Sequence, residues 1–411
     1  MTDLITRLEE FGDADPATFP YEDVIAAFHK LGKHFVAKEL LAALDSVRRA
    51  ATDPQLGRFL DCALDKYDAT YNYPSYTGLP LLALPDGEDP ARASRMHDRL
   101  LTLLMGDLLR FELAAADSQT ELLSRMRPDE RVTAKRCRLC LRVLGQRMEQ
   151  LGLCGRELAA SPVAAARRAQ AAIALTVTPA EQRTLDLSML PVDIVHDEYM
   201  FIRVLQTFES TFALMGILLA RAIKELERGD GGAAAAGALL RECAAALHNA
   251  GPLFSLLATM QVGAFRLFRE FTEGASAIQS RGYKLMEALC RPPAAERLDS
   301  AAFLNVPDVR AQVLAGLPSL QEAVLRAEAD GRLPADARRE LDADMGQFAG
   351  ALVSWRTTHY RLAVRMLGEA PGTGYTEGTP YLKSVQRIPV FDADADAAAA
   401  TGQQREEEPR S

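Results

Sequence analysis

The sequence is poor in aromatic residues, histidine and basic charge. Aromatic residues make up 7% of its 411 residues, tryptophan occurs once and histidine six times. Acidic residues outnumber lysine and arginine by 56 to 47, which gives a net charge of -9 at pH 7. Binding to nucleic-acid phosphates depends on a basic face. Nucleic acid is therefore not expected as a partner.

Long hydrophobic runs are also missing. The longest, "FALMGILLARAI" at residues 212–223, is too short to cross a bilayer and is interrupted by Arg221. No apolar stretch follows the N-terminal "MTDLITRLEEFGDADP", so neither secretion nor a membrane is expected. The six cysteines are scattered through helical patterns, which is typical of a reduced cytoplasm. Cys137 and Cys140 form a CxxC pair with no second pair to complete a zinc site.

Helical periodicity is abundant, whereas strand alternation is nearly absent. Apolar residues recur at spacings of three and four, as in "YEDVIAAFHKLGKHFVAKELLAALDSV", and the 48% hydrophobic content is enough for a sizeable core. The pattern predicts an all-α fold, a helical bundle. Helices are expected at 197–228, 238–257, 260–271, 279–290, 309–329 and 335–367. We expect an N-terminal helical region at 1–178, a helical core at 179–390 and a disordered acidic tail at 391–411.

His359 lies on the last of these helices and is followed by a loop rich in glycine and threonine. Trp355 shares its helix face, being four residues earlier. A histidine in this setting is either a core residue satisfied by a carbonyl or an axial metal ligand. No histidine or carboxylate stands three or four residues away, so a zinc site is not expected. A haem needs only one protein ligand and an apolar slot. The loop, "PGTGYTEGTPY", is either a plain turn or a close approach of the backbone to a ligand.

Two earlier segments combine aromatic and charged residues. In "QVGAFRLFREF", Phe265, Phe268 and Arg269 share one helix face. Two rings beside a guanidinium suit an aromatic amino acid, whose carboxylate arginine would bind in a bidentate pair; an amphipathic helix with a solvated arginine is the alternative. In "HDEYMFIRVLQTFES" the acidic residues mark a helix start, and Phe201 begins an apolar stripe that is typical of a core.

Taken in order, these segments resemble the tryptophan 2,3-dioxygenase superfamily of haem-dependent aromatic oxygenases. The resemblance covers residues 180–390. Its motifs are His196-Asp197-Glu198 with Phe201-Ile202, Phe265-x-x-Phe268-Arg269, Ala275-Ser276 with Gln279-Ser280, Trp355-Arg356 with His359, Arg365 with Gly368, and Gly372-Thr373-Gly374-Tyr375-Thr376 with Gly378 and Tyr381-Leu382. The resemblance implies a bundle of that type carrying haem b, with O2 and an aromatic amino acid as substrates. It also implies a homo-oligomer, a dimer or a tetramer.

The resemblance also implies roles for individual residues. His359 corresponds to the histidine that ligates the haem iron, with Trp355 and Gly374 beside the cofactor. Arg269 corresponds to the arginine that binds the substrate carboxylate, and Thr373 to the threonine near the substrate ammonium group. The implied substrate pocket is completed by Phe201, Leu205, Phe265 and Ser276.

Two positions depart from the family pattern. Tryptophan-cleaving members carry a distal histidine where this chain has Leu205, and a tyrosine where it has Phe265. The distal pocket therefore lacks two polar groups that would meet an indole N–H and bound oxygen, and distal polarity influences how O2 reacts. We expect an oxygenase, a dioxygenase or a monooxygenase, acting on tryptophan, tyrosine or a derivative in natural-product biosynthesis.

Three alternatives remain open. The first is a tryptophan 2,3-dioxygenase that forms N-formylkynurenine. The second is a haem protein or amino-acid sensor without turnover. The third is a helical interaction protein that binds no cofactor.

In the family, an N-terminal segment of a neighbouring subunit adds aromatic residues to the active site. The tyrosine-rich stretch 66–82, "KYDATYNYPSYTGLPLL", is the corresponding segment here or else an ordinary turn between domains.

Overall fold

The protein is built from helices, as the computed structural model shows. It describes residues 2–11, 15–145, 147–153, 161–229, 231–368, 372 and 378–392. Within these ranges every regular element is a helix, and the β contact present is an isolated bridge between Arg125 and Val195. The predicted all-α fold is confirmed.

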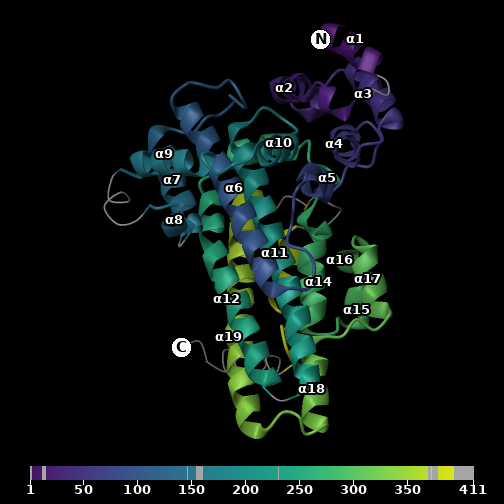
Figure 1. The fold of residues 1–411 in the computed structure, drawn as a ribbon, viewed down its shortest axis with the longest axis vertical. Coiled ribbons are helices and arrows are strands. Elements are labelled where there is room, and N and C mark those ends of the chain that lie inside the picture. Colours follow the sequence, from purple (N-terminus) through teal and green to yellow (C-terminus); the bar gives the residue numbers. More distant parts are fainter. Residues whose placement is uncertain are drawn as a thin grey trace, which may run out of the picture.

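Four short helices cover one end of the molecule (Figure 1). They are α1 (Thr2–Phe11), α2 (Tyr21–Leu31), α3 (Lys38–Ala50) and α4 (Pro54–Leu64). Their apolar faces form a core of their own, to which Leu187 and Leu190 contribute. Gly32, with φ of 82°, lies so close to Val192 that a Cβ would be 2.6 Å from its carbonyl oxygen. This contact fixes the small helices to the segment that precedes the longest helices of the bundle.

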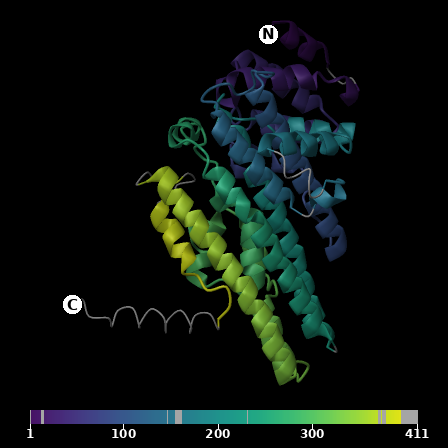
Figure 2. The same ribbon diagram turned by 90° about the vertical axis from the view of Figure 1, so that its left-hand side faces the viewer.

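The rest of the chain forms an elongated bundle. Its first helices are α5 (Tyr73–Tyr76), α6 (Pro90–Ala116), α7 (Glu130–Leu144), α8 (Arg147–Gln150), α9 (Pro162–Ala174) and α10 (Pro179–Leu187). Next come α11 (His196–Arg228), α12 (Gly232–Leu257), α13 (Val262–Arg269), α14 (Arg281–Cys290), α15 (Ala295–Leu298), α16 (Ala301–Leu304), α17 (Pro307–Leu314), α18 (Leu320–Ala329), α19 (Ala335–Leu367) and α20 (Thr379–Gln386). α11 packs on α6, α12 and α14, while α19 packs on α12 and α20 (Figures 1 and 2).

One hydrophobic core runs through the bundle from Tyr76 to Phe391. It includes apolar residues of α6, α7 and α9 as well as those of α11, α12 and α19, so it crosses residue 178. The division of the chain at 178 stays a prediction. Phe391 is buried and contacts Phe348, so the first residue of the predicted tail belongs to this core. Residues 393–411 lie outside the described residues.

Most predicted helix positions agree with the structure. The helix expected at 335–367 is α19, and those expected at 197–228 and 279–290 correspond to α11 and α14 within two residues. The single helix expected at 309–329 is wrong, because α17 ends at Leu314 and α18 begins at Leu320. Gly316 adopts φ of 89°, a left-handed conformation that ends helices. Pro318 follows, and Ser319 starts α18 with a capping box to Glu322.

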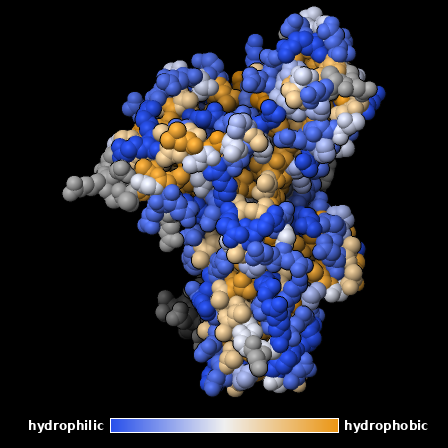
Figure 3. All heavy atoms as spheres, viewed as in Figure 1, coloured by the Kyte–Doolittle hydropathy of each residue, from blue (hydrophilic) through white to orange (hydrophobic). Residues whose placement is uncertain are grey.

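One helix, α11, is long and apolar enough to cross a membrane by length and composition. However, 83% of its most apolar stretch is buried by other parts of the protein, which is the position of a core helix. Hydrophilic residues cover much of the face in Figure 3, and hydrophobic residues show between them, most of all in the upper half. Cys137 and Cys140 are buried in α7, and no group of metal-ligating side chains occurs among the described residues.

Candidate functional site

A large pocket lies where α11, α12, α13, α14 and α19 meet, with α5 and α20 at its sides. It contains about 1610 Å³ of space not filled by protein atoms, part of it open to solvent. Most of its wall is apolar or aromatic. An apolar and aromatic wall of this kind suits a planar hydrophobic ligand.

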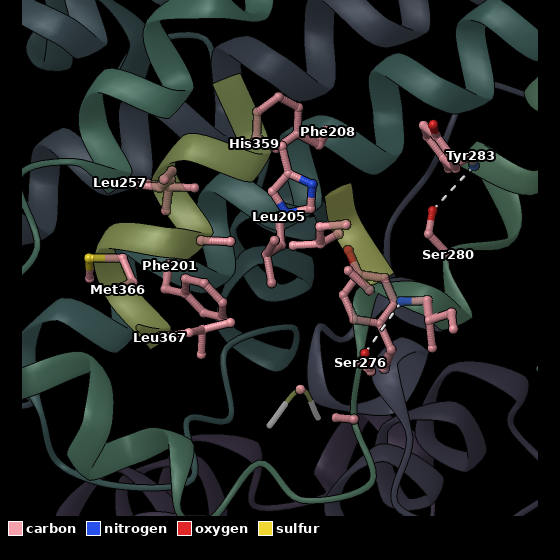
Figure 4. Close-up of a pocket in the computed structure, with 18 of the residues that line it drawn as sticks. Phe201, Leu205, Phe208, Leu257, Ser276, Ser280, Tyr283, His359, Met366 and Leu367 are labelled. Atoms are coloured by element: carbon pink, nitrogen blue, oxygen red, sulfur yellow. Dashed lines mark hydrogen bonds between the residues drawn. The ribbon is translucent and has the colours of Figure 1, made fainter. Parts of the chain in front are cut away.

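His359 projects into this pocket from α19 (Figure 4). Its ring centroid lies 5.3 Å from that of Trp355 and 6.1 Å from that of Phe254. Burial lowers the pKa of His359 to about 4, because a charged imidazole is disfavoured in apolar surroundings. The side chain is therefore neutral at pH 7 and carries the lone pair that a metal ion requires.

Aromatic side chains form the wall below His359. Phe201 on α11 contacts Phe265 and Phe268 on α13, with ring centroids 5.9 and 5.4 Å away. Leu205, one turn after Phe201, lies between Phe201 and His359 (Figure 4). No polar side chain stands at 205 or 265, so this part of the wall is hydrophobic, as the sequence indicated.

Arg269 ends α13 and lines the same pocket. It is partly buried, and burial lowers the pKa of its guanidinium below the ordinary value. The helix that carries it is held at its start by Asp197, whose Oδ2 accepts a hydrogen bond from the Gln261 N–H at 2.9 Å. Asp197 also forms a buried ion pair with Arg136 of α7 at 2.5 Å. The histidine–aspartate–glutamate motif thus ties helices together, beyond marking a helix start.

The loop before α14 brings small polar groups to the pocket. The Ser276 hydroxyl accepts from the Ile278 N–H and caps the short turn that follows. Gln279 Oε1 accepts hydrogen bonds from the backbone N–H groups of Ser276 and Tyr73, at 3.2 and 2.8 Å. This amide joins the loop to α5, a segment some 200 residues earlier.

The tyrosine-rich segment forms part of the pocket wall within the same chain. Tyr73 and Tyr76 of α5 both line the pocket. The Tyr76 hydroxyl donates to Glu198 at 3.3 Å, and the Tyr73 hydroxyl donates to Glu209 at 3.0 Å. Both carboxylates are on α11. The sequence offered this segment either as the counterpart of the segment that a neighbouring subunit contributes in the family or as an ordinary turn; in this structure it lines the pocket of its own chain.

Sequence reasoning missed several residues of the wall. Phe208, Phe254 and Tyr283 surround Trp355, with ring centroids 5.6, 5.3 and 5.7 Å from it. Glu209 is a buried carboxyl on the pocket wall. It lies eight residues after Phe201, on the same face of α11, so a carboxylate within an apolar stripe was the signal that could have found it.

Two predicted site residues, Thr373 and Gly374, lie outside the described residues, as do their neighbours Tyr375 and Thr376. Gly372 and Gly378, which flank this gap, both line the pocket. The other predicted residues come together there: Phe201, Leu205, Phe265, Arg269, Ser276, Trp355 and His359.

The residues present fit a haem. His359 would hold the haem iron through a nitrogen of its neutral imidazole. The indole N–H of Trp355 is buried and has no partner among the described residues. Buried polar groups normally have partners, so an unpaired N–H on the wall of a pocket suits an additional occupant. Apolar side chains such as Leu257, Leu362 and Met366 provide the surroundings that a porphyrin requires.

Fold and site together define an all-helical protein with one histidine above an aromatic, arginine-containing pocket. No family model matches the chain. Relatives do: the tryptophan 2,3-dioxygenase of Anaeromyxobacter sp. strain K is 29% identical over 230 residues, which span 48% of this chain and 84% of the relative. The tryptophan 2,3-dioxygenase of Pseudomonas aeruginosa PAO1 is 28% identical over 237 residues, which span 50% of this chain and 82% of the relative. The chain is a divergent member of the tryptophan 2,3-dioxygenase superfamily, a family of haem-dependent oxidoreductases.

Proposed function

We propose that this protein is a haem-dependent oxygenase acting on an aromatic amino acid or a close derivative. The observation that carries the proposal is the position of the neutral His359 imidazole above a pocket that also contains Arg269 and three phenylalanine rings. His359 would hold the iron, and the bound haem would supply O2 activation. Further parts of the proposal are a cytoplasmic location, a homodimer or homotetramer, and a role in natural-product biosynthesis.

The protein's own residues have separate tasks in this proposal. Arg269 binds the substrate carboxylate in a charge-assisted pair. Phe201, Phe265 and Phe268 hold the aromatic side chain by contact with ring faces and edges. Tyr73 and Tyr76 cover the pocket from α5 and help to exclude water. Thr373 is proposed as a contact of the substrate ammonium group, and Gly374 as a neighbour of the cofactor.

The hydrophobic wall supports the proposed preference for substrate and reaction type. At Leu205 and Phe265 the chain offers no partner for an indole N–H, and an unpaired buried donor is costly. We therefore favour a substrate that has no ring N–H facing Leu205 and Phe265, or one whose ring is not an indole. We also favour oxygen insertion over ring cleavage. Formation of N-formylkynurenine from tryptophan is the second candidate, because the relatives bear the name tryptophan 2,3-dioxygenase.

The test is a haem titration of the full chain, followed by oxygen uptake. Trp355 is the sole tryptophan and lies 5.3 Å from His359 between ring centroids, so a haem in the pocket quenches its emission by energy transfer. We expect saturable quenching and a Soret band in the parent, and loss of that band in His359→Ala. His248→Ala is the matched control, because His248 is exposed on α12.

The reduced, loaded protein is then mixed with aromatic amino acids in an oxygen electrode. Oxygen consumption that one amino acid stimulates supports the oxygenase, and mass spectrometry of the product counts the oxygen atoms inserted. Haem binding and a spectral response without oxygen consumption would replace the proposal by an amino-acid sensor. A parent that binds no haem would leave a helical interaction protein.

A further inference from the structure

Glu209 lies between two cavities. It is 3% exposed and lines the main pocket. It also lines a second cavity with about 1600 Å³ of space not filled by protein atoms, part of it open to solvent. The second cavity is bounded by the chain between α5 and α6, by α11 and by α14, and its wall includes Ile217 and Leu285. Glu209 and Phe212 are the α11 residues that belong to both walls.

The two oxygens of the carboxyl group face different sides. Oε1 accepts the hydrogen bond of the Tyr73 hydroxyl, which belongs to the main pocket. Oε2 lies beside Gly282, which belongs to the second cavity; a Cβ on Gly282 would be 3.3 Å from Oε2. With no side chain at 282, backbone alone separates this side of the carboxyl group from the wall of the second cavity, which Glu209 and Gly282 both line. Ser280 provides another hydrogen bond to the carboxyl group.

No cation balances Glu209 among the described residues. The nearby charges are already paired. From α14, Lys284 pairs with Glu287 and Arg281 with Asp308.

Farther along the second cavity, Lys224 pairs with Glu88 and Arg221 with Glu225. From α6, His97 is bonded to Ser210, next to Glu209. Burial raises the pKa of Glu209 to about 7, while the hydrogen bonds from Ser280 and Tyr73 act in the opposite direction. A group with a pKa near the working pH can both give and take a proton.

We propose that Glu209 carries protons between water in the second cavity and the main pocket, with the Tyr73 hydroxyl controlling its charge. The O–H bond of the carboxylic acid breaks as its proton moves to a basic group in the main pocket. The carboxylate then takes a proton at Oε2 from a hydronium ion in the second cavity, which leaves as water. This inference rests on the proposed function for its use in catalysis. It gives the pocket an acid–base group that Leu205 and Phe265 do not provide.

The first experiment follows the carboxyl group itself by infrared spectroscopy, in the full chain without haem, from pH about 5 to about 9. Glu198 is also a buried carboxyl, and burial raises its pKa to about 8, so the band of Glu209 is taken as the difference between the parent and Glu209→Gln spectra. We expect this difference band to disappear as the pH rises through about 7. Glu227→Gln, an exposed position on the same helix, keeps the band. In Tyr73→Phe the midpoint moves to higher pH, because the hydrogen bond that stabilises the carboxylate is gone.

The second experiment tests the route by exchange of the same band into D2O. Gly216 lines the second cavity, and a Cβ there would meet Leu285 at 3.9 Å. Gly216→Leu is therefore expected to fill space in the second cavity and slow the exchange while the midpoint stays in place. Exchange as fast as in the parent would overturn the proposed route. A Glu209→Gln spectrum identical to that of the parent, or an unshifted midpoint in Tyr73→Phe, would overturn the role of Glu209.

The third measurement is the reduction potential of the haem-loaded protein against pH. In the parent, the plot of reduction potential against pH is expected to change slope near the pH at which Glu209 is half protonated. In Glu209→Gln this change of slope is lost. An identical pH dependence in both proteins would show that this carboxyl exchanges no proton with the pocket. The infrared measurements need no haem. A protein that binds no haem can therefore be distinguished from one in which Glu209 does not carry protons.

Discussion

Asp197 Oδ2 accepts a hydrogen bond from the backbone N–H of Gln261 at 2.9 Å. Asp197 stands in the first turn of α11, and Gln261 is the residue just before α13. The bond therefore joins the helix that carries Phe201 to the helix that carries Arg269. The two halves of the proposed substrate site are positioned relative to each other by this contact.

Asp197→Asn is expected to weaken ligand binding and stability together. The asparagine side chain still offers an oxygen to the Gln261 N–H. The substitution, however, removes the negative charge that faces the buried Arg136. The loss of a charged partner in a buried site costs about 1–3 kcal/mol. Chemical denaturation measures this change. Asp61→Asn is the control, because the Asp61 side chain is 69% exposed and lies 3.6 Å from Arg48; its effect should be small. Equal losses in both variants would contradict the role of the Asp197 charge in holding Arg136.

Arg269→Ala is expected to weaken the binding of aromatic amino acids through the carboxylate alone. A hydrogen bond to a charged group contributes about 1.5–3 kcal/mol, so the dissociation constant should rise roughly 10- to 100-fold. Spectral titration of the haem-loaded protein gives this constant. The corresponding aromatic amines, which lack the carboxylate, should bind the parent and the variant with equal affinity. A weaker amine affinity in the variant would mean that Arg269 acts through pocket shape.

Leu205→His introduces into the hydrophobic wall the histidine that tryptophan-cleaving members of the family carry at this position. For a ligand with a ring N–H, a neutral hydrogen bond contributes about 0.5–1.5 kcal/mol, so tryptophan affinity should rise roughly 2- to 10-fold. 1-Methyltryptophan, which lacks the N–H, should gain nothing. Burying the imidazole is expected to lower the free energy of unfolding. If both ligands gained equally, the hydrogen-bond explanation would be wrong.

Haem binding should be insensitive to pH until strongly acidic conditions. The folded-state pKa of His359 is about 4, below the value of about 6.5 for an exposed histidine. Between these values the unfolded chain takes up a proton that the folded chain does not, so stability falls as the pH falls. The imidazole itself stays neutral down to pH about 4, where protonation competes with iron. Trp355 emission under haem titration at each pH gives the affinity. A loss of haem centred near pH 6.5 would show that His359 is not shielded from water.

The sequence predicted those parts of the site that depend on local patterns. Spacing along α19 predicted that His359 and Trp355 share a face, and spacing along α13 predicted the same for Phe265 and Arg269. Their roles at the site were implied only by the family resemblance. The periodicity of these helices decides which residues share a face, and the ordered motifs placed them in one pocket. The helix break near Gly316 was readable too, because a glycine and a proline interrupt the pattern there.

Contacts between distant segments were not readable. In the sequence, Glu209 is one polar residue in an apolar stripe. Its proposed role depends on Tyr73 of α5 and Gly282 of α14, which lie beside its two carboxyl oxygens. The aromatic cage of Trp355 likewise draws Phe254 from α12 and Tyr283 from α14. Such contacts depend on how whole helices pack, and no local pattern records them.

The position of α5 over the pocket depends on Gly78. This residue has φ of 60°, and a Cβ there would lie 2.7 Å from the Ser188 carbonyl oxygen. Gly78→Ala therefore combines backbone strain with a clash against backbone atoms, and a loss of about 2–4 kcal/mol in the free energy of unfolding is expected. The segment would have to move away from Ser188, and Tyr73 and Tyr76 would move with it.

Gly57→Ala is the matched control, because Gly57 lies inside α4, where an added Cβ would meet no neighbouring atom within 4 Å. Alanine there is expected to stabilise the protein by about 0.5–1 kcal/mol. Iodide quenching of Trp355 emission separates the two effects: access to the pocket should increase in Gly78→Ala and stay unchanged in Gly57→Ala. Unchanged access in Gly78→Ala would mean that α5 does not cover the pocket in solution.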